Sequence, residues 1–138
     1  MKRIIAILLA VTIWAISIGA ERNEPLQNDG HIDFEAAGFQ KMYTTAYILE
    51  GTTADGGYTR PYICASSLDH IGDIALVYTL EGNYLGAYLC TDTGREGGGV
   101  RAGRVLDIWR KNMTQATSYM KVVGPEQKVY VLWIEGDG

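Results

Sequence analysis

Short runs rich in β-branched and aromatic residues, separated by turn-forming segments, constrain the fold of this chain more than any other feature. Apolar residues alternate along residues 73–80, and the turn Glu81-Gly82-Asn83 leads into the next run, which predicts a β-hairpin. About six strands in roughly 100 residues predict a mainly β domain built as a small barrel. The runs expected to form strands are 41–48, 62–65, 73–80, 84–91, 104–109 and 128–134.

One predicted helix and two glycine-containing loops lie between these strands. Asn112 is a suitable cap for a short helix over residues 113–120. Residues 51–58 combine glycine with threonine and aspartate, which predicts a loop. Residues 93–103 hold five glycines and no long apolar run, so a flexible loop is expected there as well.

The first residues have the order of an export signal. Lys2 and Arg3 precede an uncharged apolar run over residues 4–20, and polarity returns abruptly at Glu21. We expect residues 1–20 to be a cleaved signal sequence or an uncleaved signal anchor. A buried core helix is the third alternative for this segment.

The segment after the apolar run predicts the domain organisation. Residues 21–38 are polar and irregular, which indicates a flexible linker, and the domain itself is expected over residues 39–138. With either form of signal, the protein is expected to be secreted or associated with the cell wall. Contact with a membrane is then expected only through residues 4–20.

The charge balance argues against several kinds of partner. The sequence has 12 basic and 16 acidic residues, a net charge of −4. Loss of Lys2 and Arg3 with a cleaved signal leaves 10 basic residues against 16 acidic, a net charge of −6. Nucleic acid is therefore not an expected partner. His31 and His70 are too few and too scattered for a zinc site, and no metal or other cofactor is expected.

Cys64 and Cys90 are the two cysteines of the chain. In an oxidising compartment they could form a disulfide. The alternative is that both are small buried thiols, and the sequence leaves the two open. Neither belongs to a Cys-x-x-Cys or Cys-His pattern that would indicate a catalytic thiol.

Two aspartates stand out as candidate catalytic groups. Asp92 ends a predicted strand, and Asp107 interrupts the apolar strand 104–109. A carboxylate among Val, Leu, Ile and Trp side chains is costly to bury ionised, so its pKa is expected to rise unless it is paired. A carboxyl group protonated near neutral pH can act as a general acid. The alternatives are that Asp107 faces solvent or pairs with Arg104 or Arg110, and that Asp92 belongs to an ordinary turn.

Six short motifs occur in one order between residues 43 and 134. They are Thr45-Ala46-Tyr47, Thr53-Ala54-Asp55-Gly56, Ile71-Gly72-Asp73 with Leu76-Val77-Tyr78, Asp92-Thr93-Gly94, Gly103-Arg104-Val105-Leu106-Asp107-Ile108-Trp109, and Val129-Tyr130-Val131-Leu132. In this order they resemble the three-aspartate (3D) domain of exported bacterial wall hydrolases. That family is similar to the catalytic core of membrane-bound lytic transglycosylase A. The resemblance implies a six-stranded double-psi β-barrel.

The resemblance also implies roles for individual residues. The third aspartate of the family is the acid/base, and it corresponds to Asp107. The second aspartate corresponds to Asp92, which is expected to raise the pKa of Asp107 or to anchor substrate. The implied substrate contacts at matching positions are Thr45, Tyr47, Thr93, Gly94 and Arg104.

Two positions depart from the family pattern. Where the family has its first aspartate, the run Ile63-Cys64-Ala65 leads to Ser66, and Asp69 follows three positions later. Either Asp69 takes that role through a shifted loop or the role is lost, and both Ser66 and Asp69 remain candidate substrate-binding residues. The loop 95–103 is longer than in the family and has no aligned lysine, so its substrate contacts are expected to differ.

The implied activity is cleavage of the MurNAc–GlcNAc bond of peptidoglycan to a 1,6-anhydro product, with glycan strands as the partner. One acid/base suffices for this reaction because the sugar's own 6-hydroxyl attacks intramolecularly. Two alternatives stay open. One is a non-catalytic module that binds peptidoglycan or another polysaccharide. The other is a virus-encoded or spore-associated structural part that keeps the barrel as a scaffold.

Overall fold

The computed structural model describes residues 32–137 of the chain. The predicted signal or anchor over residues 1–20 lies outside the described residues, as does most of the predicted linker. One compact unit spans Asp33–Gly138. Within the described part of the chain, no helix is long and apolar enough to cross a membrane.

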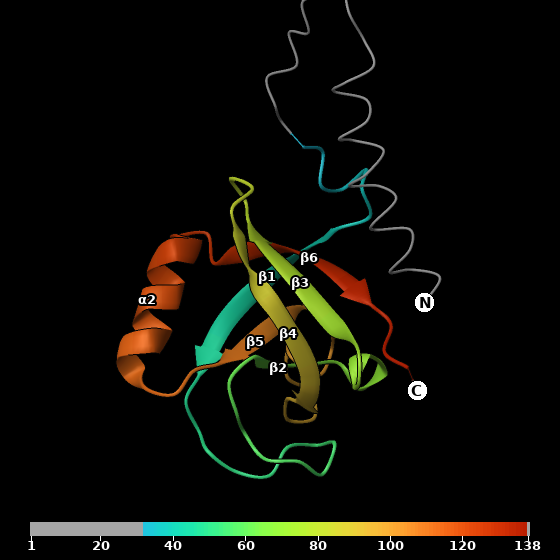
Figure 1. Ribbon diagram of the computed structural model, residues 1–138, viewed down its shortest axis with the longest axis vertical. Helices are drawn as coiled ribbons and strands as arrows, with labels where there is room; N and C mark the ends of the chain where they lie inside the picture. Colours follow the sequence, from blue (N-terminus) through green and yellow to red (C-terminus); the bar gives the residue numbers. More distant parts are fainter. Residues whose placement is uncertain (1–31, 138) are drawn as a thin grey trace, which may run out of the picture. The chain divides into compact units, whose positions relative to one another are not determined.

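Six strands close into a barrel, and one short α-helix packs against it, so the predicted small six-stranded barrel with one helix is confirmed. The order of strands around the barrel is β1-β5-β2-β4-β3-β6. Figure 1 shows the helix beside the barrel and the β3–β4 hairpin extending beyond it. The elements are β1 (Gln40–Tyr47), β2 (Ile63–Ser66), the 3-10 turn η1 (Leu68–His70), β3 (Ile74–Thr79), β4 (Tyr84–Thr93), β5 (Val105–Trp109), α2 (Met113–Val123) and β6 (Lys128–Ile134).

Two interlocked motifs give the barrel its topology. β5 lies between β1 and β2, and it is parallel to β1 and antiparallel to β2. β2 in turn lies between β4 and β5, and it is parallel to β4. Each motif therefore has two consecutive antiparallel strands with a third strand inserted between them. This is the double-psi arrangement, and it places β2 between β4 and β5, which both come later in the chain.

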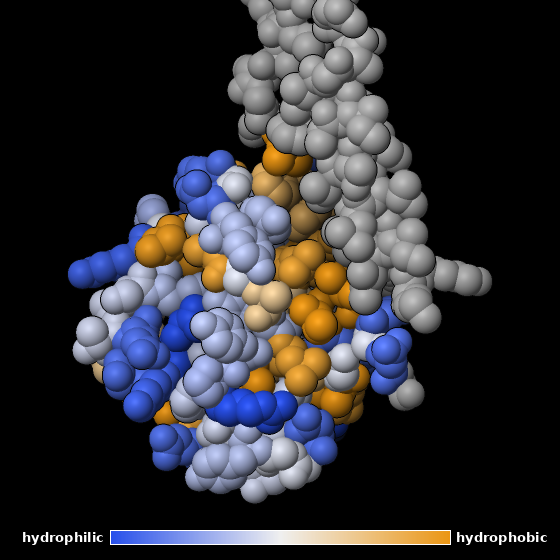
Figure 2. Space-filling model, in the orientation of Figure 1, coloured by the Kyte–Doolittle hydropathy of each residue, from blue (hydrophilic) through white to orange (hydrophobic). Residues whose placement is uncertain are grey.

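Strand alternation separates the barrel core from its outer surface. In β3, Ala75, Val77 and Thr79 are buried, whereas the residues between them are partly exposed. The outer face of the β3–β4 hairpin is apolar too, because Ile74 pairs with Leu89. Figure 2 shows hydrophobic residues gathered over this part of the surface. The core cluster consists of Met42, Cys64, Ala75, Val77, Tyr88, Cys90, Leu106, Ile108, Tyr119, Val123, Val129 and Val131.

The helix α2 begins at the predicted cap and runs past the predicted end. The Asn112 side chain accepts a hydrogen bond from the backbone N–H of Gln115 at 2.9 Å. Ala116, Tyr119 and Val123 are its buried residues, which is the spacing of one helical face. The helix continues to Val123 because that side chain completes the buried stripe, whereas the sequence predicted an end at residue 120.

The compact unit begins earlier than the predicted boundary at residue 39. Phe34 is only 6 % exposed. Its ring stacks on Tyr130 with centroids 4.8 Å apart and meets Phe39 at 5.0 Å and Tyr78 at 5.3 Å. Asp33 holds the turn that contains Phe34 by accepting a hydrogen bond from the N–H of Ala36 at 3.0 Å. Residues 33–38 therefore belong to the domain, because one aromatic ring in a polar stretch packs on the barrel wall.

Replacement of Phe34 by alanine tests this boundary. We expect Phe34→Ala to lower the free energy of unfolding by about 3 kcal/mol, because a buried aromatic ring is removed from a packed cluster. Ile32→Ala is the matched control, since Ile32 is 46 % exposed. Urea denaturation followed by tryptophan fluorescence measures both. Equal stability of Phe34→Ala and the wild type would show that the domain begins after residue 38.

Candidate active site

Four residues on four neighbouring strands form a row on one face of the sheet. Thr45 of β1 pairs with Asp107 of β5, Asp107 pairs with Ala65 of β2, and Ala65 pairs with Asp92 of β4. Residues paired across a sheet carry their side chains on the same face. The two aspartates thus lie two strand spacings apart, about 10 Å between Cα atoms, with Ala65 on the strand between them. We call Thr45, Asp107, Ala65 and Asp92 the aspartate row.

A β-bulge puts Asp92 into this row. Cys64 pairs with Cys90, but the next residue, Ala65, pairs with Asp92, so Thr91 is an extra residue in β4. In regular pairing Thr91 would stand beside Ala65, and the Asp92 side chain would point to the opposite face. The bulge therefore decides that the two carboxyl groups share one face.

Asp92 is held by backbone donors from two segments. Its Oδ1 accepts hydrogen bonds from the N–H of Thr93 at 2.9 Å and from the N–H of Ala54 at 3.1 Å. Nearby, the N–H of Asp55 donates to the carbonyl oxygen of Thr91 at 3.0 Å. The loop between β1 and β2 is thereby fastened to the end of β4, and an ionised Asp92 is well solvated by the backbone.

Asp107 has a different environment. Thr45 Oγ1 donates to its Oδ1 at 2.8 Å. Burial raises the pKa of Asp107 above its ordinary value of 3.8; the hydrogen bond from Thr45 lowers it in part, and the negative charge of Asp92 raises it further. The net effect favours the protonated carboxylic acid up to a higher pH than for an exposed aspartate.

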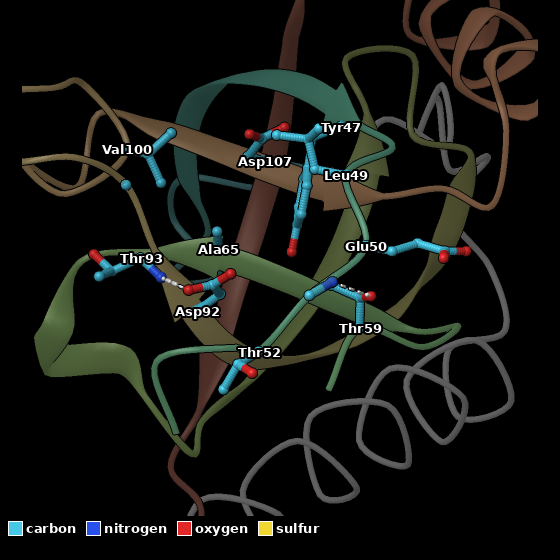
Figure 3. Close-up of a pocket in the computed structure, with 12 residues that line it drawn as sticks. Tyr47, Leu49, Glu50, Thr52, Thr59, Ala65, Asp92, Thr93, Val100 and Asp107 are labelled. Atoms are coloured by element: carbon cyan, nitrogen blue, oxygen red, sulfur yellow. Dashed lines mark hydrogen bonds between the residues drawn. The ribbon is translucent and has the colours of Figure 1, made fainter. Parts of the chain in front are cut away.

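Tyr47 lies between the two carboxyl groups. Figure 3 shows its ring extending past Asp107 toward Ala65 and Asp92. Burial raises the pKa of Tyr47, and the charges of Asp92 and Asp107 raise it further, so the phenol stays neutral. Its buried hydroxyl, like that of Thr93, has no hydrogen-bond partner among the described residues. These two unpaired hydroxyls are candidate partners for a polar ligand in the pocket.

These side chains line a pocket of about 280 Å³ on the outside of the barrel. One wall is the segment after β1 and the other is the glycine-rich loop after β4 (Figure 3). Gly94 is required where that loop turns, because a Cβ there would lie 2.7 Å from the Cβ of Val100. The lining residues are Tyr47, Leu49, Glu50, Gly51, Thr52, Thr59, Ala65, Asp92, Thr93, Gly94, Val100 and Asp107.

Most, but not all, of the candidate residues meet in this pocket. Ser66 is wholly buried and Asp69 is exposed on η1, and neither lines the pocket. Arg104 is also exposed and outside the lining, and its carbonyl oxygen accepts from the N–H of Tyr43. The residues that the pocket gathers are Asp92, Asp107, Tyr47, Thr93 and Gly94, with Thr45 hydrogen-bonded to Asp107 from the neighbouring strand.

Sequence reasoning missed one whole wall of the pocket. Leu49, Glu50, Gly51, Thr52 and Thr59 come from the segment between β1 and β2, which the sequence marks only in part as a loop. The Gly51 N–H donates to Thr59 Oγ1 at 3.2 Å, and the Trp109 indole donates to the Leu49 carbonyl oxygen at 3.0 Å. Glu50 points away from both aspartates (Figure 3). Ala65 was also missed, although its small side chain is what leaves room between the carboxyl groups.

The two cysteines lie directly beneath this site. Cys64 and Cys90 are register partners on β2 and β4, and both are buried free thiols. A hydrogen bond with Cys90 and burial raise the pKa of the Cys64 thiol. Both belong to the barrel core, next to the bulge at Thr91.

Residues 32–137 contain no group of three His, Cys, Asp or Glu side chains arranged to hold a metal ion. Comparison with protein-family models, with curated proteins and with solved structures found no match.

The raised pKa of Asp107 predicts a pH-dependent stability difference between the wild type and Asp107→Asn. At neutral pH the ionised carboxylate destabilises the folded state, because its folded pKa lies above the unfolded value near 3.8. The asparagine amide keeps an acceptor for Thr45 without that charge. Asp107→Asn should therefore have the higher melting temperature at pH 7.

The difference should shrink as the pH falls through the folded pKa and level off below 3.8. Thermal melts followed by circular dichroism between pH 3 and pH 8 measure it, with Asp69→Asn as the exposed control. The raised pKa of Asp107 would be contradicted if Asp107→Asn had a lower melting temperature than the wild type at pH 7. It would also be contradicted if the higher melting temperature of Asp107→Asn did not shrink in acid.

Proposed function

We propose that this protein is a lytic transglycosylase that cleaves the MurNAc–GlcNAc bond of peptidoglycan outside the cytoplasmic membrane. The observation that carries the proposal is Asp107, a half-buried carboxyl group with a raised pKa in a pocket that also holds Asp92. The motif order that resembles 3D domains supports the same activity. The predicted export of the chain would deliver the domain to this substrate.

The chemistry needs one group that first gives and then takes a proton. Protonated Asp107 donates its proton to the glycosidic oxygen as the bond from C1 of MurNAc to that oxygen breaks. The resulting carboxylate then accepts the proton of the MurNAc 6-hydroxyl as O6 bonds to C1. The products are a 1,6-anhydro sugar and a free 4-hydroxyl, and the carboxyl group is regenerated. Intramolecular attack replaces the second, water-activating carboxylate that an inverting glycosidase requires.

The surrounding residues have supporting roles in this scheme. The hydrogen bond from Thr45 orients the Asp107 carboxyl group. Asp92 keeps a negative charge nearby, which favours the protonated starting state of Asp107 and stabilises positive charge developing on the sugar ring. The unpaired hydroxyls of Tyr47 and Thr93 can hydrogen-bond the hydroxyl or acetamido groups of the sugar.

A non-catalytic glycan-binding barrel is the second candidate. The observation that favours it is Ser66, which stands where the 3D pattern has its first aspartate and is wholly buried. Asp69 does not replace that carboxylate, since it is exposed on η1 outside the pocket lining. In this case the pocket would bind a sugar without cleaving the chain.

Release of anhydro-muropeptides from purified sacculi separates the two candidates. The full-length wild type, purified in mild detergent, should release them, as mass spectrometry detects. Asp107→Asn should reduce the rate by at least about 100-fold, because the proton donor is lost. Asp69→Asn is the matched control and should act like the wild type. If the wild type sediments with sacculi but releases no anhydro product, the protein is a binding module.

Tyr47→Phe tests the proposed sugar contact. We expect kcat/KM for sacculi to fall about 10-fold, the size expected for one lost hydrogen bond to substrate. Stability should stay the same or rise, because the hydroxyl has no partner in the protein. Tyr43→Phe is the control, with a ring 52 % exposed and outside the pocket lining. Unchanged kcat/KM in Tyr47→Phe would remove Tyr47 from the binding site.

A further inference from the structure

A second hollow, of about 420 Å³, lies between α2 and the start of β4. Arg110, which directly follows β5, forms part of its wall together with Leu85 of β4 and Tyr119 of α2. Thr114, Gln115 and Ser118 of α2 also line it. The proposed reaction uses none of these residues, and no acidic side chain lines the hollow.

The Arg110 guanidinium is fixed in place by aromatic residues. It lies 4.8 Å from the centroid of the Tyr119 ring and 5.4 Å from that of Tyr88. Its Nη2 donates to Tyr88 Oη at 2.9 Å, and that hydroxyl donates to the carbonyl oxygen of Leu85 at 3.0 Å. The Arg110 backbone N–H donates to the Tyr47 carbonyl oxygen at 2.8 Å. The side chain is thus preorganised, which lowers the entropy lost when it binds a ligand.

Arg110 lacks a counter-ion in the described part of the chain. The ion pairs recorded there are Lys41 with Glu35 and His70 with Asp73. A guanidinium carries five N–H donors, and one hydrogen bond to Tyr88 leaves most of them available. Arg110 is thus a partly buried cation that has free donors and no acidic partner among the described residues. This combination suits an anionic ligand.

The helix supplies further groups suited to an anion. Thr114 and Ser118 are four residues apart on α2, so their hydroxyls lie on one side of the helix. Thr114 belongs to the first turn, where the helix dipole is positive. Gln115 Oε1 accepts from the N–H of Lys111 at 3.2 Å, which leaves its amide N–H groups as donors.

We propose that this hollow binds a carboxylate, namely a free carboxylate of the stem peptide attached to the glycan strand. A planar guanidinium matches a carboxylate with two parallel hydrogen bonds. Arg110 follows Asp107 by three residues in the chain and lies just past the end of β5. The choice of stem peptide rests on the proposed function, whereas the carboxylate chemistry rests on the hollow itself.

Titration of the full-length protein with a defined peptide tests the proposal. The probe is L-Ala-γ-D-Glu-L-Lys-D-Ala with free carboxylates, followed by NMR shifts of the Arg110 Nε–H and the Ser118 amide. The fully amidated peptide and inorganic phosphate are the comparison ligands. We expect the free peptide to bind at least tenfold more tightly than either of them. Equal binding of the amidated peptide, or tighter binding of phosphate, would overturn the proposal.

Variants locate the binding. Arg110→Gln should weaken binding at least tenfold, and Arg110→Lys should only partly restore it, because lysine lacks the planar fork. Since Arg110 also packs on two tyrosines, Ser118→Leu is the second variant; it fills the hollow from an exposed helix position and should abolish binding. Thr117→Leu, exposed on the same helix but outside the hollow, is the control and should bind as the wild type does. Wild-type binding by Arg110→Gln and Ser118→Leu would overturn the proposal.

The two proposals can fail separately. Asp107→Asn should bind the peptide as tightly as the wild type, because Asp107 lies in the other pocket. If the peptide binds at Arg110 and no anhydro-muropeptides are released, the carboxylate site is supported and the proposed cleavage reaction is refuted. If sacculi are cleaved and the peptide does not shift the Arg110 signal, the carboxylate site is refuted and the proposed cleavage reaction is supported.

Discussion

The extra residue Thr91 in β4 is the constraint on which the site depends. It shifts the pairing of β2 and β4 by one residue between Cys64 and Ala65, and this shift turns the Asp92 side chain to the face that carries Asp107. At the residue before the bulge, Cys64 of β2 and Cys90 of β4 are still partners in the strand register, and both thiols lie in the barrel core. The same fold thus provides a packed interior and, one residue further along, two carboxyl groups on its surface.

Different surroundings then give the two carboxyl groups different properties. Asp92 receives two backbone N–H donors, which suit an ionised carboxylate. Asp107 receives one hydroxyl donor from Thr45, and burial raises its pKa. Enzymes place two carboxyl groups in different environments so that one stays protonated and donates a proton while the other stays ionised. Tyr47, neutral and without a partner in the protein, lies between the two.

The sequence predicts this structure well where local patterns decide it. Alternation and turn residues were enough for all six strands, and Asn112 marked the start of α2 correctly. Asp107 stood out because a charged residue interrupts an apolar strand. The register of β2 against β4 could not be predicted, because a parallel bulge between strands distant in sequence has no local signal. For the same reason the burial of Phe34 and the pocket wall around Thr59 were missed, since both depend on contacts across the barrel.

The fold favours the carboxylic acid form of Asp107 up to a pH at which an exposed aspartate is ionised. Carboxyl-carbon NMR titration of Asp107 in the wild type and in Asp92→Asn measures this directly. A titration midpoint above 3.8 in the wild type, which falls when the charge of Asp92 is removed, is the predicted result. A midpoint at or below 3.8 in the wild type would contradict the claim and remove Asp107 as the proton donor.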